Sequence, residues 1–128
     1  MLRFPRLALA IEVLAHGGTG TPVMVFDEVD AGISGRVAEL VGRQLKALAE
    51  NTQVLCVTHL PQVGALADQH FEVSKKESTG ASAAVVTRLG DEQRVEAIAA
   101  MLGGVRVSDT AREHARELIA CKQAGPLP

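Results

Sequence analysis

Aromatic residues are scarce in this sequence, which has three phenylalanines and neither tyrosine nor tryptophan among 128 residues. Its core must therefore come mainly from alanine, valine, leucine and isoleucine, and binding of single-stranded nucleic acid by stacking bases on aromatic side chains is not expected. A large excess of charge of either sign is also lacking, because 13 basic and 15 acidic residues leave a net charge of −2. The chain as a whole thus has no basic footprint for nucleic acid, and we expect most DNA contact to lie elsewhere in a larger protein.

Cysteines and long apolar runs are few as well. The two cysteines, Cys56 and Cys121, are far apart, so the sequence does not indicate a disulfide framework and fits a reducing cytoplasm. The apolar run Leu7–Ile11 follows two arginines, like the start of a signal peptide, but Glu12 interrupts it. A run of this length cannot span a bilayer. The favoured interpretation is a buried helix in a cytoplasmic protein with no membrane partner.

A phosphate-binding loop is the third absence. No stretch of the sequence fits the pattern G-x-x-x-x-G-K-[ST], in which backbone amides and a lysine hold nucleotide phosphates. The glycine-rich segment Gly17–Gly20 has no lysine and does not follow a predicted strand. Because positioning supplies most of the catalysis in phosphoryl transfer, we do not expect this chain to hydrolyse ATP alone.

The hydrophobic pattern of the first half predicts alternating helices and strands. Continuous apolar runs favour two fully buried strands, and helical periodicity or a leading proline favours the segments around them. This alternation is typical of an α/β fold with a mainly parallel sheet flanked by helices. The predicted elements are a helix over 6–15, a strand over 23–26, a helix over 34–49, a strand over 53–57 and a short helix over 61–67.

Helical periodicity over 34–49 predicts an apolar stripe opposite a charged face, with an ion pair between Glu39 and Arg43. The stripe comprises Val37, Leu40, Val41, Leu45 and Leu48.

The second half predicts a strand hairpin followed by two helices. Alternation from Phe71 and the run 83–88 indicate two strands, with the polar stretch 75–82 as their loop. A helix ending at Gly103-Gly104 and another beginning at Ser108 or Asp109 follow. We expect the first to bury Val95, Ile98, Ala99 and Leu102, and the second Ala111, Ala115, Leu118 and Ile119. The tail 122–128 is expected to be frayed, and residues 1–128 are interpreted as a single partial domain.

Two carboxylates follow the first predicted strand. Asp27 and Glu28 stand at its carboxyl end, the edge where open α/β sheets bind ligands. An acid there can hold Mg²⁺ beside nucleotide phosphates, and a second acid can orient or deprotonate an attacking water. The alternative is that both are ordinary polar residues where a strand leaves the core.

A histidine follows the second predicted strand at the matching position. If the two strands are neighbours, His59 and Glu28 face one cavity, where an imidazole can bind a terminal phosphate or the attacking water. Taken alone, His59 would be interpreted as an ordinary loop histidine. The presence of Asp27-Glu28 at the end of the other strand is what favours a functional role for it. Zinc is not favoured, because Cys56 and His59 are spaced C-x-x-H with no second pair nearby.

The loop Asp30-Ala31-Gly32-Ile33-Ser34-Gly35 connects the first strand to a helix and would lie at the rim of the same site. Together these segments resemble the heads of ABC-type and SMC-like P-loop ATPases. Val23–Glu28 resembles a Walker B strand with its catalytic glutamate, Asp30–Gly35 a D-loop, and Val57-Thr58-His59 a switch histidine. The longer stretches 25–35 and 57–63 are similar to the RecN family of bacterial DNA repair ATPases, over about residues 6–120.

That resemblance implies roles for the matching residues. Asp27 would help to hold Mg²⁺, Glu28 would be the general base or water-orienting residue, and His59 would sense the γ-phosphate. Asp30, Gly32, Ser34 and Gly35 would lie beside ATP at the interface of two head protomers. It further implies repair of DNA double-strand breaks and recombination in the bacterial cytoplasm, at the nucleoid, with DNA contacted through the complete protein.

The sequence also departs from the family pattern. Met1–Pro5 stands where the family has a Ser-Gly-Gly-Glu signature, and no coiled-coil segment is present. We therefore expect the C-terminal half of an ATPase head, which would bind ATP and Mg²⁺ only together with an N-terminal P-loop half. The alternatives are a non-catalytic remnant or interaction module and, less favoured by the motifs, a transporter-type ATPase head. Whether the chain is an enzyme is left open, and the isolated chain is expected to be poorly soluble or oligomeric.

Overall fold

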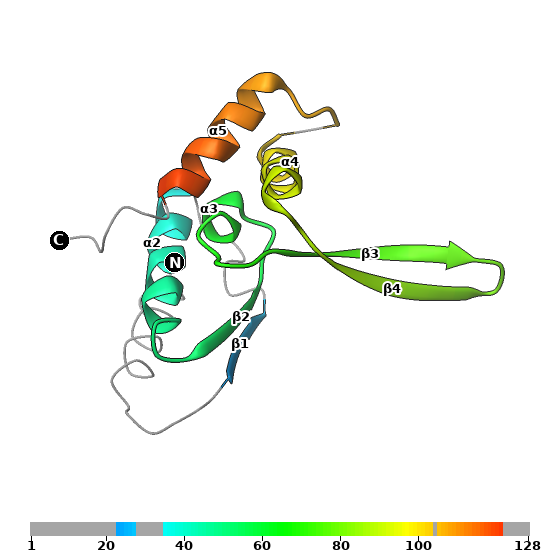
Figure 1. The fold of residues 1–128 in the computed structure, drawn as a ribbon, viewed down its shortest axis with the longest axis horizontal. Coiled ribbons are helices and arrows are strands. Elements are labelled where there is room, and N and C mark those ends of the chain that lie inside the picture. The colour runs from blue at the N-terminus through cyan, green and yellow to red at the C-terminus, as the bar shows by residue number, and fades with distance from the viewer. Residues whose placement is uncertain (1–22, 28–34, 104, 122–128) are drawn as a thin grey trace.

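The computed structural model describes residues 23–27, 35–103 and 105–121, so the helix predicted over 6–15 and the tail 122–128 lie outside the described residues. The elements alternate as the sequence predicts, with a hairpin and two helices at the end (Figure 1). In chain order they are β1 (Val23–Asp27), α2 (Gly35–Leu48), β2 (Gln53–Val57), α3 (Pro61–Gly64), β3 (Phe71–Ser78), β4 (Ala81–Arg88), α4 (Asp91–Leu102) and α5 (Asp109–Ala120).

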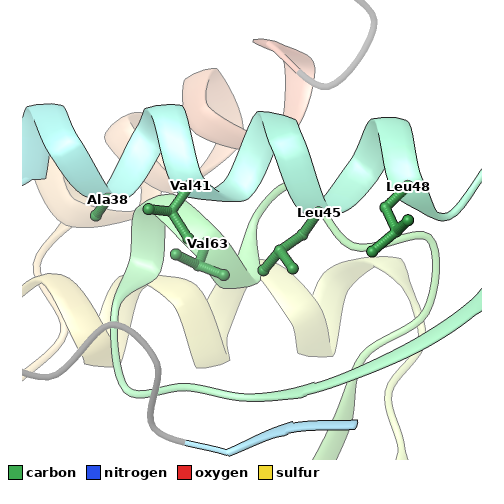
Figure 2. Packing of buried hydrophobic residues seen from close by; sticks show 5 residues of the cluster. All are labelled: Ala38, Val41, Leu45, Leu48 and Val63. Atoms are coloured by element: carbon green, nitrogen blue, oxygen red, sulfur yellow. The ribbon is translucent and has the colours of Figure 1, made fainter. Parts of the chain in front are cut away.

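β1 and β2 form a two-stranded parallel sheet, and α2 connects them. Their register runs from Val23 opposite Gln53 to Asp27 opposite Val57. Apolar side chains of α2 point towards α3 and the sheet, where they pack into one cluster (Figure 2). The buried members are Ala38, Val41, Leu45, Leu48 and Val63, and Met24, Phe26, Val54, Cys56 and Leu60 pack against them. The predicted ion pair between Glu39 and Arg43 is confirmed, at 2.9 Å.

The prediction that both strands are fully buried is wrong. The face of the sheet opposite α2 is exposed, and we call its apolar residues Val23, Val25, Leu55 and Val57 the outer sheet face. Val25 is 66% exposed and Val57 56% exposed, because within the described residues helix α2 covers the other side of each strand. Leu40 of the predicted stripe is also 37% exposed, since Ala38 and Gly42 are turned towards the core in its place.

Exposure of the outer sheet face leads to a prediction about association. We expect the isolated chain to self-associate, and Val25→Thr combined with Val57→Thr to weaken that association by about tenfold or more, because less apolar area is buried. Size-exclusion chromatography with light scattering would measure it. A matched control is Val73→Thr with Val86→Thr, an exposed cross-strand pair of the hairpin. A parent chain that runs as a monodisperse monomer would contradict the prediction.

Helix α3 is shorter than the predicted helix over 61–67. Beyond Gly64 the chain continues as tighter turns, in which Leu66 N donates to Val63 O and Ala67 N to Gly64 O. α3 also lies very close to α2, since a Cβ at Gly42 would come within 2.7 Å of Leu66 Cδ1 and 3.3 Å of the Gln62 carbonyl oxygen. Glycine at position 42 is therefore what allows α3 to pack directly on α2.

The hairpin β3–β4 projects from the helices (Figure 1). Its strands pair from Phe71 opposite Arg88 to Ser78 opposite Ala81, so the predicted loop over 75–82 is wrong. The turn is confined to Thr79-Gly80, and Gly80 has a φ of 89°, a conformation that glycine adopts without strain. Polar residues fit these strands because almost every residue of the hairpin is exposed.

The last two helices pack on each other and on the segment after α3. Their cluster includes the predicted residues Val95, Ile98, Ala99 and Ala115, which are buried, while Leu102, Ala111, Leu118 and Ile119 pack against them. Ser108 caps α5 as predicted, its Oγ accepting from Ala111 N at 3.1 Å. None of the helices in the described part of the chain combines the length and apolar character needed to cross a membrane.

Candidate functional site

The two predicted site strands end at the same edge of the sheet. β1 and β2 are parallel and in register, with Asp27 opposite Val57, so Thr58 and His59 follow β2 beside the end of β1. The condition that the strands are neighbours is thereby confirmed. Asp27 and His59 are both exposed. Glu28 comes next after Asp27 in the chain, but it lies outside the described residues.

Hydrogen bonds hold the turn around His59. Leu60 N donates to Thr58 Oγ1 at 3.0 Å, and Leu60 O accepts from Val63 N and Gly64 N at 3.1 and 3.0 Å. The Leu60 side chain packs against the α2 cluster. Both neighbours of His59 are therefore fixed, while the imidazole is presented to solvent.

The end of the predicted D-loop lies against the segment that follows His59. Of the predicted residues Asp30, Gly32, Ser34 and Gly35, the structure describes Gly35, the first residue of α2; the other three lie outside the described residues. A Cβ at Gly35 would be 3.1 Å from Nε2 of Gln62, so the amide of Gln62 packs directly over this glycine. Nothing in the sequence around Gln62 predicts this contact.

Arg94 is a second residue that the sequence reasoning missed. It lies on α4, is 9% exposed, and donates from Nη2 to the carbonyl oxygens of Gly64, Ala65 and Ala67. Burial lowers the pKa of its guanidinium, against the opposing influence of Asp68 and Asp91. No local pattern around an arginine on an amphipathic helix could have indicated these distant acceptors.

His70, at the base of the hairpin, carries a shifted pKa. Burial and then the nearby Arg94 cation lower the pKa of its imidazole, and Glu72 opposes them. The folded state therefore disfavours the protonated form, so stability is complete above the unfolded pKa near 6.5 and falls as pH drops below it. We expect urea unfolding of His70→Gln to show a weaker loss of stability between pH 7.5 and 5 than the parent chain. An equal loss in both would contradict this.

Carboxylates suited to a metal ion occur singly in the described part of the chain. Within the described residues, no three His, Cys, Asp or Glu side chains lie close enough together to hold a metal ion. Asp27 is an exposed carboxylate at a strand end, which fits Mg²⁺, since that ion keeps several waters and takes one or two protein carboxylates beside substrate phosphates. An open groove of about 390 Å³ at the base of the hairpin involves other residues: Glu72, Leu89, Gln93, Glu96, Ala97, Ala100 and Val107.

Comparison with known proteins finds close relatives along most of the sequence. The chain is 51% identical over 115 residues to DNA repair protein RecN of Mycobacterium leprae, covering 89% of this chain and 19% of that protein. It is 49% identical over 114 residues to RecN of Xylella fastidiosa (strain 9a5c), covering 89% and 20%. RecN of Halalkalibacterium halodurans gives 43% over 114 residues, with the same coverage as the Xylella protein. Over most of its length, the sequence thus resembles one part of RecN proteins.

The chain spans about a fifth of the length of these RecN proteins, which fits a C-terminal part of the head. No family model matches it. Among solved structures, it resembles one from work on the ATP-driven dimerisation and DNA-stimulated activation of SMC ATPases. The TM-score is 0.63 at 20% identity, and the match covers 81% of this chain and 61% of that one. The predicted fold class, an α/β part of an SMC-like P-loop ATPase head, is confirmed.

Proposed function

We propose that this chain is the catalytic C-terminal half of a RecN-type ATPase head that acts in DNA double-strand-break repair and recombination. The observation that carries the proposal is the in-register pairing of β1 with β2, which brings Asp27 and the turn at His59 to one edge of the sheet. Sequence similarity to RecN proteins supports the choice of reaction.

In this proposal each site residue has one task. Asp27 holds Mg²⁺ through its water shell, and the bound ion neutralises charge on the nucleotide phosphates. Glu28 accepts or orients the proton of the attacking water, and His59 donates a hydrogen bond to the γ-phosphate. Asp30, Gly32, Ser34 and Gly35 form the loop beside ATP at the contact with a second head.

The chain needs a partner for this activity. Its sequence contains no P-loop, so ATP and Mg²⁺ would be bound together with an N-terminal P-loop half, and the outer sheet face is an apolar surface that a complementary half can cover. DNA would be contacted through the complete protein, at the nucleoid in the cytoplasm.

The test is Mg-ATP hydrolysis by the purified chain, alone and mixed with a separately produced N-terminal half of a RecN-type head. Turnover in the mixture only would support the proposal. No turnover in either sample, from folded protein that forms the complex, would favour the alternative of a non-catalytic interaction module.

A further inference from the structure

Arg94 is the buried charged residue in the described part of the chain, and none of the steps proposed above uses it. Its Nη2 lies 3.2 Å from Gly64 O and 2.9 Å from Ala65 O, and it also bonds Ala67 O. Two N–H groups on this nitrogen are thus shared among three carbonyl oxygens. Burying a cation is costly unless hydrogen bonds compensate it, so these contacts explain how Arg94 is tolerated there.

The three acceptors are Gly64, the last residue of α3, and two residues of the turns that follow it, Ala65 and Ala67. A helix of one turn is not stable alone, and its last carbonyl groups have no partners inside the helix. The guanidinium gives Gly64 O a second donor beside Ala67 N, binds the carbonyl groups of Ala65 and Ala67, and places a positive charge where the helix dipole favours it. Arg94 therefore closes α3 from a helix that lies about 30 residues further along the chain.

From α3, hydrogen bonds lead back to the turn at His59. Ala65 N donates to Pro61 O at 2.9 Å, Gly64 N donates to Leu60 O at 3.0 Å, and Leu60 N donates to Thr58 Oγ1 at 3.0 Å. Pro61 at the start of the helix adds a fixed φ and has no N–H to satisfy. The Leu60 backbone and, through it, the Thr58 side chain are thus connected to the segment whose carbonyl groups Arg94 holds.

We propose that Arg94 is a positioning residue for His59: it fixes α3 from its far end, and α3 fixes the turn that presents the imidazole beside the end of β1. The catalytic consequence rests on the function proposed above, whereas the mechanical connection does not.

Amide hydrogen exchange on the full 128-residue chain tests the connection directly. Arg94→Met keeps an apolar stem but removes the donors, and Arg94→Lys restores a cation with three donors. The control for lowered stability is Leu118→Ala, because Leu118 of α5 packs against the hydrophobic cluster that includes Ala65. We expect Arg94→Met to speed exchange at Leu60, Gly64 and Ala65 by about tenfold beyond its effect on the remaining core amides, and Leu118→Ala to lack this local excess. Arg94→Lys should recover part of the protection.

Uniform acceleration of exchange in Arg94→Met would overturn the proposal, and so would an equal local excess in Leu118→Ala. If Arg94→Met fails to fold, Arg94→Gln carries the same comparison, with Arg94→Lys again as the variant that recovers protection.

ATP hydrolysis by the mixture of this chain with the N-terminal half tests the catalytic consequence. Arg94→Met should lower kcat about ten- to a hundredfold with little change in KM for ATP, because a misplaced group loses its alignment with the transition state. Added to His59→Ala, it should cause no further loss. A full additional loss in the double variant would overturn positioning through His59. If even the parent mixture is inactive while exchange changes as expected, the proposed function fails and the connection from Arg94 to the His59 turn stands.

Discussion

Glu28→Gln is expected to lower kcat for ATP by about 100-fold or more in the mixture of this chain with an N-terminal half, because an amide cannot accept the proton of the attacking water. Glutamine has nearly the shape of glutamate, so nucleotide and partner binding should survive. Steady-state turnover together with equilibrium binding of a fluorescent ATP analogue would separate the two effects. Loss of turnover with retained binding is the result that identifies Glu28 as the catalytic carboxylate.

A matched substitution is available on the same chain. Glu50 is exposed just after α2, so Glu50→Gln makes the same chemical change away from the strand ends and should leave kcat unaltered. Asp27→Asn gives a different signature if Asp27 supports the metal: turnover should fall but recover in part as the Mg²⁺ concentration is raised. If Glu28→Gln hydrolyses ATP at the parental rate, Glu28 is not part of the mechanism.

The local elements could be predicted because their signals are local. The bounds of β2 follow from an apolar run between polar residues, and α2 begins and ends within one residue of its predicted bounds, 34–49. The exposure of β1 and β2 could not be predicted in this way. A continuous apolar run indicates that a strand is suited to burial on both faces, but it does not say which segment covers the second face. The strand character of the polar stretch in the hairpin could not be predicted for a related reason: strands exposed on both faces need no apolar alternation.

The residues of the candidate site also fall into those that local sequence signals could predict and those that they could not. The prediction that His59 and Glu28 face one cavity depended on β1 and β2 being neighbours, and their register confirms that condition alone. Glu28, Asp30, Gly32 and Ser34 stay predictions, since they lie outside the described residues. Contacts between distant segments gave no sequence signal at all. Gln62 packs on Gly35, and Arg94 reaches α3, only because α2, α3 and α4 are stacked together in the fold.

His59→Ala is the second substitution with a large expected effect, and the structure makes its interpretation simple. Because the imidazole is exposed while Thr58 and Leu60 carry the hydrogen bonds and packing of the turn, its removal should change the free energy of unfolding by no more than about 0.5 kcal/mol. In the mixture with the N-terminal half, kcat should nevertheless fall by about 100-fold, as expected when one donor to a developing charge is lost.

Two further variants sharpen that test. His59→Gln keeps a donor at a similar reach and should recover part of the activity, whereas His114→Ala removes an exposed histidine of α5 and should have no effect on kcat. Urea unfolding of each chain would show that folding is intact, so a fall in turnover reports on the site itself. If His59→Ala hydrolyses ATP at the parental rate, the imidazole does not act on the phosphate. The shared edge of β1 and β2 would then serve the reaction through its carboxylates alone.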